Sequence, residues 1–414
     1  MRAWIARSTM AIAICLLPGH AVAAPPDFRL PAVELRVALV RALGEHAFLV
    51  IELMRTGVTG GAEFEVVAEA VEANSVDIVD MIDSVYGPDA AAAFGEQWRS
   101  HVAYLVDYTR AIAAGDEDAQ DLAASQLETY VTEFSELLVS AAPGLPEDAV
   151  HGLIGEHRQQ LQQIAGLGAG DYAGSYPALR ATYAHMFMIG DGLALAITDQ
   201  FPDRFEGKSV AFSPAVDVRV TLDRLFGEHT YLAALVMRAR LAQSADLDAA
   251  IEALSANSAE LRDVIEGVYG ADAAAAFDDL WRSHVDLYVA YVAAVSDGDD
   301  AAAQAALDGL SDYRTEFGAF VAGANPFLEA EVLEELLQVH TDHLVAQVLD
   351  YRDGEYAAAY ETLREAYGHT AELAAGLGGA IAEQFPMLFP DTAMRGGSVQ
   401  GAVPSRWSAS QHPD

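Results

Sequence analysis

Apolar residues recur at intervals of three and four along nearly the whole chain, which is the spacing of one face of an α-helix. Ala, Leu and Glu, which favour helix, dominate these stretches, and no run alternates Val, Ile or Thr as a strand would. Because the breaks between the periodic stretches are short, successive helices are expected to run antiparallel, and we predict an all-α protein of up-and-down helical bundles. In the first part of the chain the breaks separate six segments, at 32–56, 62–86, 88–114, 117–141, 146–165 and 171–201.

The same sequence pattern occurs twice in the chain. Four motifs recur after 183 or 184 positions: GEH at 44–46 and 227–229, DAAAAF at 89–94 and 272–277, WRSHV at 98–102 and 281–285, and QFP at 200–202 and 384–386. A repeat of this length indicates a duplicated domain rather than a solenoid unit. We therefore expect two homologous bundles of about six helices each, at 32–205 and 214–390, joined by a short linker.

A weaker repeat lies inside each copy. GEH at 44–46 recurs at 155–157, and the same shift of 111 places Asn74 on His185. This shift superposes the first helical hairpin of a copy on its last. Each bundle is therefore expected to contain a four-helix core of two related hairpins, bridged by the third and fourth helices.

The N-terminus has the pattern of a secretory signal peptide. A basic start precedes a short apolar run, and small residues at 21–23 suit cleavage, so we expect residues 1–23 to be removed. The apolar run is too short to span a membrane, and no later segment is apolar enough to do so. The mature protein is thus expected to be secreted or periplasmic. The tail at 391–414 is rich in Gly, Ser and Pro, and we expect it to be disordered.

Acidic residues greatly outnumber basic ones, 62 against 23, and the formal net charge is −39. This charge opposes binding to nucleic acid and to anionic membrane surfaces, whereas it favours solubility and the attraction of cations. The only cysteine, Cys15, lies in the predicted signal peptide. The mature protein is therefore expected to rely on its core, without a disulfide, for stability.

Histidine positions repeat along with the motifs. Eight of the twelve histidines form four matched pairs, so that each copy carries one on each of four predicted helices. The pairs are His46 and His229, His101 and His284, His157 and His340, and His185 and His369. If these side chains point inward, three or four imidazoles could meet inside each bundle, where neutral imidazole suits copper, zinc or iron. We predict one metal site per copy, built from these eight histidines.

A purely structural role for the histidines is the alternative, because buried His and Tyr residues often serve packing and hydrogen bonding. The chain would then be a structural or interaction module of the cell envelope, and its protein partner is left open by the sequence. An enzyme is a third class, but the HExxH, ExxH, GxSxG and phosphate-loop patterns are all missing. Storage, buffering or sensing of a metal is therefore expected rather than turnover.

The motif series GEH, VYG, WRSH, YxTEF, GDY and QFP resembles a family of exported bacterial tandem helical-bundle proteins. Similar segments lie beside domains of the copper-amine-oxidase N-terminal type, a domain that this chain lacks. The resemblance covers residues 33–202 and 216–386, and it implies an exported helical bundle without assigning an activity. Hemerythrins are a looser comparison, because their closely spaced HxxxE and HxxxH pairs are not present here.

Overall fold

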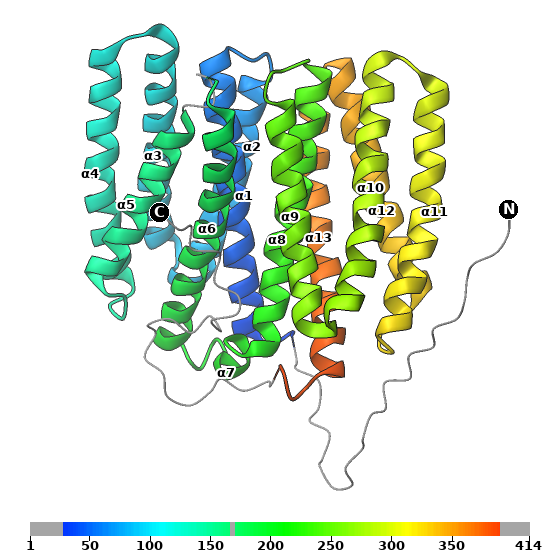
Figure 1. Ribbon diagram of the computed structural model, residues 1–414. Coiled ribbons are helices and arrows are strands. Elements are labelled where there is room, and N and C mark those ends of the chain that lie inside the picture. Colours follow the sequence, from blue (N-terminus) through cyan, green and yellow to red (C-terminus); the bar gives the residue numbers. More distant parts are fainter. Residues whose placement is uncertain (1–27, 166–169, 390–414) are drawn as a thin grey trace, which may run out of the picture.

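The computed structural model describes residues 28–165 and 170–389, and these residues form thirteen helices and no strand (Figure 1). The prediction of an all-α protein is confirmed. The predicted signal peptide at 1–23 and the predicted tail at 391–414 lie outside the described residues. Within them, no helix combines the length and the apolar character needed to cross a membrane.

Six helices make up the first half of the molecule, which we define as residues 31–200. They are α1 (Pro31–Thr59), α2 (Phe64–Tyr86), α3 (Pro88–Ala114), α4 (Glu117–Ala141), α5 (Glu147–Ile164) and α6 (Tyr172–Gln200). The six segments predicted from the sequence agree with these bounds to within three residues at each end.

Six further helices make up the second half, residues 214–384, and the short helix α7 (Lys208–Ala211) lies between the halves. They are α8 (Pro214–Leu241), α9 (Leu247–Tyr269), α10 (Ala271–Asp297), α11 (Asp300–Ala324), α12 (Ala330–Asp353) and α13 (Tyr356–Gln384). Five of the six corresponding helices agree in length to within one residue: α2 and α9, for example, each have 23 residues, and α3 and α10 each have 27. The exception is the fifth, because α5 has 18 residues and α12 has 24.

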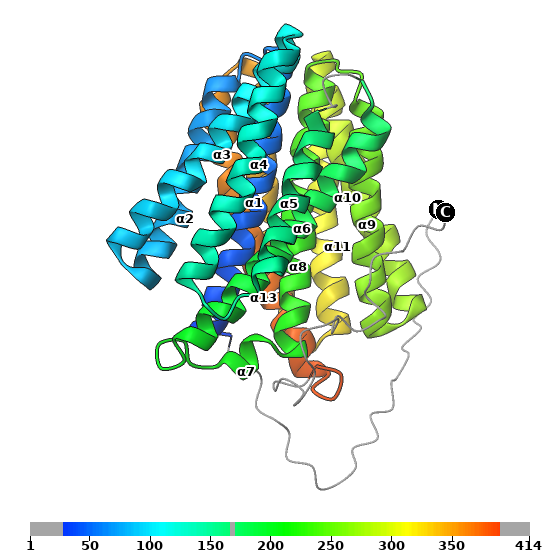
Figure 2. The ribbon, with the colours of Figure 1, turned by 90° about the vertical axis from the view of Figure 1, so that its left-hand side faces the viewer.

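The helices stand side by side, and each long helix packs against its neighbour in sequence within its half (Figure 1). Helix α1 also packs against α6 and α3, and α8 makes the equivalent contacts with α13 and α10. The two halves meet mainly where α1 contacts α8, α6 contacts α9, and α13 contacts α2. Seen from the side, the helices stand several deep, with α2 and α3 on one side, α9 and α10 on the other, and α7 at the lower end (Figure 2).

Local sequence explains where the helices begin and end. Gly87 and Gly270 separate α2 from α3 and α9 from α10, and each has φ of 86° with extended ψ, a conformation that only glycine adopts readily. Asp116 and Asp299 cap α4 and α11, because each side chain accepts a hydrogen bond from the backbone N–H three residues later, at 3.0 Å. The same chemistry at matched positions therefore places these helix boundaries at equivalent points in the two halves.

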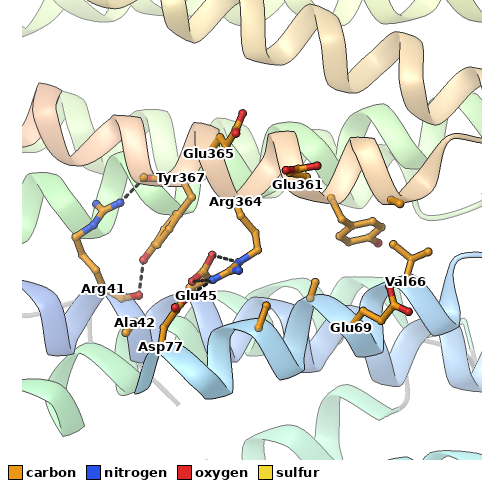
Figure 3. A pocket seen from close by; sticks show the side chains of 15 residues that line it. Arg41, Ala42, Glu45, Val66, Glu69, Asp77, Glu361, Arg364, Glu365 and Tyr367 are labelled. Atoms are coloured by element: carbon orange, nitrogen blue, oxygen red, sulfur yellow. Dashed lines mark hydrogen bonds and ion pairs between the residues drawn. The ribbon is translucent and has the colours of Figure 1, made fainter. Parts of the chain in front are cut away.

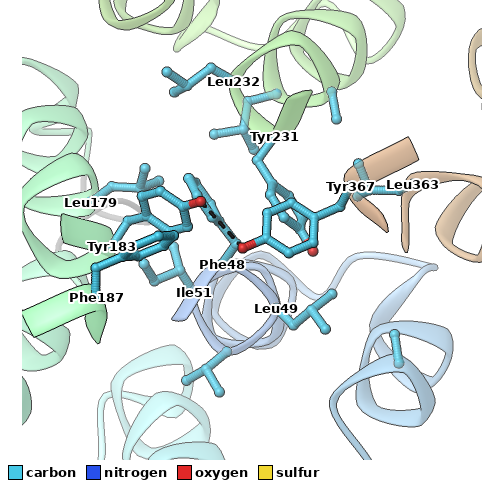
Figure 4. Packing of buried hydrophobic residues seen from close by; sticks show 14 of the residues in the cluster. Phe48, Leu49, Ile51, Leu179, Tyr183, Phe187, Tyr231, Leu232, Leu363 and Tyr367 are labelled. Carbon is cyan, nitrogen blue, oxygen red and sulfur yellow. Dashed lines mark hydrogen bonds between the residues drawn. The ribbon is translucent and has the colours of Figure 1, made fainter. Parts of the chain in front are cut away.

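The core consists of three apolar clusters. One lies entirely in the first half, one lies entirely in the second, and the largest spans both. In the shared cluster, Phe48 of α1 stacks on Tyr231 of α8, with ring centroids 4.3 Å apart (Figure 4). The halves are therefore joined by continuous hydrophobic packing as well as by the chain itself.

Candidate functional site

Two of the predicted histidines meet in the interior of each half. His46 of α1 and His101 of α3 place their Nε2 atoms 3.1 Å apart. His229 of α8 and His284 of α10 do the same at 3.4 Å. All four side chains are buried, and none is more than 6 % exposed. We refer to these as the first and second histidine pairs.

Asn74 of α2 fixes the orientation of the first pair. Its Nδ2 donates to the Glu45 carboxylate at 2.9 Å and to the Ala42 carbonyl at 3.0 Å, so its amide oxygen is left to accept. That oxygen lies 3.1 Å from His46 Nδ1, which must therefore carry the ring proton. His46 Nε2 then presents its lone pair to His101.

The second pair has the same surroundings with one contact left open. Asn257 donates through Nδ2 to the Glu228 carboxylate at 2.8 Å and to the Leu225 carbonyl at 3.0 Å. Its amide oxygen and His229 Nδ1 both lack a hydrogen-bond partner among the described residues. In the first half a hydrogen bond from the asparagine therefore fixes the tautomer of His46. In the second half the equivalent bond between Asn257 and His229 is not formed.

An arginine from the opposite half binds each carboxylate of the GEH motif. Arg364 of α13 donates to both oxygens of Glu45, at 3.0 and 3.2 Å (Figure 3). Arg180 of α6 donates to both oxygens of Glu228, at 3.0 and 2.9 Å. The two arginines are themselves equivalent under the shift of 184. A series of polar contacts therefore runs from Arg364 through Glu45 and Asn74 to His46, whereas the series from Arg180 ends at Asn257.

The third matched histidine stands near each pair without touching it. The ring centroid of His340, on α12, is 6.2 Å from that of His229. His157, on α5, is close enough to His46 and His101 for their charged forms to repel one another. The Nδ1 atoms of His157 and His340 have no hydrogen-bond partner among the described residues. A ring nitrogen is thus unused beside each pair.

The fourth matched histidine is held elsewhere. The Nε2 atoms of His185 and His369 are each 2.9 Å from a backbone carbonyl, of Leu153 and Leu336 respectively. The His185 ring lies parallel to that of His157 at a centroid distance of 6.4 Å. The structure therefore brings two histidines of each half together, places a third nearby, and ties the fourth to the backbone of the neighbouring helix.

No three His, Cys, Asp or Glu side chains are gathered closely enough to hold a metal ion in residues 28–165 and 170–389. Within each histidine pair, however, the two Nε2 atoms are about as far apart as two ligands of one metal ion. Imidazoles on one tetrahedral ion, with bonds of about 2.0–2.1 Å, have nitrogens about 3.3–3.4 Å apart. A third ligand from His157 or His340 would require that side chain to turn toward the pair.

Burial keeps these histidines neutral, because an imidazolium ion loses its hydration in the interior. Burial lowers the pKa of His101 to about 4, and together with repulsion from His101 and His157 it holds the pKa of His46 well below 6.5. The pKa falls to about 3 at His157, His229, His284 and His340. Neutral imidazole is the form that binds metal ions.

Aromatic rings from the repeated motifs surround the pairs. The ring centroids of Trp98 and His46 are 4.4 Å apart, and Tyr130 stacks on His101 with a centroid distance of 5.0 Å. In the second half Trp281 and Tyr313 occupy the equivalent positions, and Tyr313 stacks on His284 at 4.8 Å. The WRSH and YxTEF motifs thus form an apolar shell that keeps water away from the imidazoles.

Comparison with known proteins does not identify the chain: no protein-family model, no curated protein and no solved structure matches it. The resemblance to exported tandem bundles therefore remains a prediction. Any function has to be argued from the geometry of the histidine pairs and their surroundings.

The sequence pattern does not single out Arg180 and Arg364. Both are charged residues on helices, where a solvated position is the ordinary expectation. The signal that could have identified them is that the two arginines occupy equivalent positions in the repeat, as do Glu45 and Glu228. What the sequence does not reveal is that the contact crosses between the halves.

Proposed function

We propose that the chain is a tandem duplication of a six-helix bundle and that each copy binds one transition-metal ion, copper, zinc or iron. The matched helix lengths and the repeated motifs support the duplication. The metal proposal rests on one observation, the facing Nε2 atoms of two buried imidazoles at 3.1 and 3.4 Å. These distances are close to those between two nitrogens on one tetrahedral ion.

In the first copy the ion would take the place of a proton. With His46 Nε2 unprotonated, His101 donates its own Nε2 proton to it when no ion is bound. For an ion to bind both nitrogens, the His101 proton would have to leave Nε2 and His101 would have to carry its proton on Nδ1 instead, so that both Nε2 lone pairs face the ion. His157 would complete the site by turning inward, whereas His185 stays bound to the Leu153 carbonyl.

The surroundings favour holding an ion over turning over a substrate. The polar contacts of Glu45 and Asn74 orient one ligand, as partners behind metal-bound histidines do. The strongly acidic chain attracts cations from solution. With the predicted signal peptide, these features suit a protein that stores, buffers or senses metal outside the cytoplasm.

A structural role for the pairs is the second candidate, and the 3.1 Å contact favours it because this is also the length of an ordinary hydrogen bond. In that case the imidazoles would join α1 to α3, and α8 to α10, without any ion. The chain would then act as a structural or interaction module of the cell envelope.

Elemental analysis distinguishes the two functions. The full chain, purified without chelator or histidine tag and equilibrated with copper, zinc and iron, should retain one ion of a single metal per half. The double variant His46→Ala, His101→Ala should lose one of the two ions, and the exposed, unmatched His151→Ala should keep both. Absence of retained metal, or full retention by the double variant, would exclude the proposed site. Under the structural role, the double variant melts earlier to the same extent with and without metal.

A further inference from the structure

The first half contains a cavity of about 110 Å³ beside its histidine pair. All six helices of that half contribute to the wall, which is almost entirely apolar. Side chains that line it include Leu43, Ile78, Phe94, Leu137, Met186 and Ile189. His101 and His157 line it as well, and they give the cavity a polar side.

The equivalent space in the second half is much smaller, about 40 Å³. Phe226 lines it in the place of Leu43, with its ring 6.0 Å from that of Trp281. Phe320 stands in the place of Leu137 and packs against the apolar cluster of that half. Two phenyl rings therefore add volume where the first half has two smaller leucines. The cavity is a property of the first half and not of the shared fold.

The first cavity also has polar atoms that lack partners. Trp98 Nε1 forms no hydrogen bond among the described residues, whereas Trp281 Nε1 donates to Ser258 Oγ at 3.2 Å. His157 Nδ1 lacks a partner as well. A buried indole N–H and a buried imidazole nitrogen are costly to leave unsatisfied. Both belong to side chains in the cavity wall.

We propose that the cavity of the first half is a binding site for a small, uncharged molecule with an apolar body of about the size of benzene and at most one hydrogen-bonding group. Protein interiors rarely leave voids of this size, and apolar cavities of about 150 Å³ stay dry and take up benzene or xenon. The hydrogen-bonding group of such a molecule would pair with the unpartnered nitrogens, accepting from Trp98 Nε1–H or bonding to His157 Nδ1. The second half, filled by Phe226, would not bind such a molecule.

The test uses the full chain treated with chelator, so that its outcome does not depend on metal binding. Benzene and phenol are titrated while the methionine methyl resonances are followed by NMR, and the melting temperature is measured in parallel. The Met186 methyl should shift in a saturable manner, because this side chain lines the cavity, and the melting temperature should rise. The buried Met237 of the second half should not respond.

Matched variants decide where the probe binds. Leu43→Phe introduces the residue that the second half carries at this position, and it should weaken benzene binding at least tenfold. Leu137→Phe serves the same purpose if the first variant fails to fold, as judged by circular dichroism. Phe226→Leu should leave the Met186 response unchanged. Absence of any saturable shift in the wild-type chain, or equally tight binding by a folded cavity-filling variant, would overturn the proposal.

Discussion

The hydroxyl groups of Tyr183 and Tyr367 lie 3.3 Å apart between the two halves of the molecule (Figure 4). The two residues are equivalent under the shift of 184, so each tyrosine meets its own counterpart, as happens on a two-fold axis. Tyr367 donates its proton to the Arg41 carbonyl at 2.9 Å, and Tyr183 therefore donates to Tyr367. The glycines of the two GEH motifs provide the room for this contact.

Alanine at these glycines should destabilise the protein. A Cβ at Gly44 would lie 2.5 Å from the Phe187 ring, and one at Gly227 would lie 2.5 Å from the Tyr183 hydroxyl. Because these rings are fully packed, we expect each substitution to lower the free energy of unfolding by about 1–3 kcal/mol. Urea unfolding followed by circular dichroism measures the effect.

Gly192 provides the control, because it lies within α6 and an added Cβ would meet nothing within 4 Å. Gly192→Ala should be neutral or should stabilise the protein by up to about 1 kcal/mol through helix propensity. Equal stabilities for Gly44→Ala and Gly192→Ala would show that the tyrosine contact is not tightly packed.

Arg364→Gln should weaken metal binding in the first half, although Arg364 itself belongs to the second half. Arg364 orients Glu45, which in turn holds Asn74 against His46, the proposed ligand. Loss of such a partner behind a metal-bound histidine typically costs 10–100-fold in affinity, and we expect an effect of about this size. The measurement is a metal titration in the His229→Ala, His284→Ala background, which isolates the first site.

Arg99→Gln is the matched control, because Arg99 pairs with Glu72 at a solvent-exposed position on the first half itself. It should leave the affinity of the first site unchanged. If Arg99→Gln and Arg364→Gln weaken binding equally, the effect is one of overall charge and not of the contact with Glu45.

Mild acid should destabilise the metal-free protein through its buried histidines. The pKa is about 3 at His157, His229, His284 and His340 in the folded chain, against 6.5 as the ordinary value. Between these values the unfolded chain binds protons that the folded chain does not. Stability is therefore complete above about pH 6.5 and falls with decreasing pH, by about 1.4 kcal/mol per pH unit for each such histidine.

Urea unfolding at several values between about pH 7 and about pH 5 measures this slope. His340→Gln should reduce it by the contribution of one histidine, and the exposed His151→Gln should not have this effect. A slope that His340→Gln leaves unchanged would contradict the assignment of His340 as a neutral buried group.

Gln200→Ala should loosen the end of the first half. Gln200 is the last residue of α6 and the first of the QFP motif. It accepts a hydrogen bond from the Tyr86 hydroxyl at 3.0 Å and donates to the Ala141 carbonyl at 3.0 Å. The side chain thus ties α6 to the ends of α2 and α4. Because the contacts are exposed, we expect a loss of about 0.5–1.5 kcal/mol for each hydrogen bond.

Hydrogen exchange at the C-terminal turns of α2 and α4 would report the loosening directly. Gln160→Ala is the control, since the Gln160 side chain donates to Glu156 within its own helix and ties no second helix among the described residues. Unchanged protection in Gln200→Ala would mean that the apolar contact of Tyr86 with Phe201, at 5.5 Å, is sufficient by itself.

Periodicity and caps were sufficient to predict the helices, because both are local properties of the chain. The repeat indicated which histidines occupy equivalent positions, but it did not indicate which side chains meet, such as His46 and Asn74, which form a hydrogen bond. It could not predict that His185 bonds to the Leu153 carbonyl, since a rotation of about 100° per residue separates an inward from a sideways position. Nor does any local pattern record that Arg364 reaches across to Glu45, because that contact depends on how the halves dock.

The stacking of Phe48 on Tyr231 has a consequence for the order of events during folding. The first half is synthesised before Tyr231, so the face of α1 that carries Phe48 stays exposed to water until α8 arrives. Because the segment from 201 to 213 is short, the local concentration of one half near the other is high, and their closure should be first order. The chain is most prone to aggregate just before that closure, when the apolar faces that will meet between the halves are still apart.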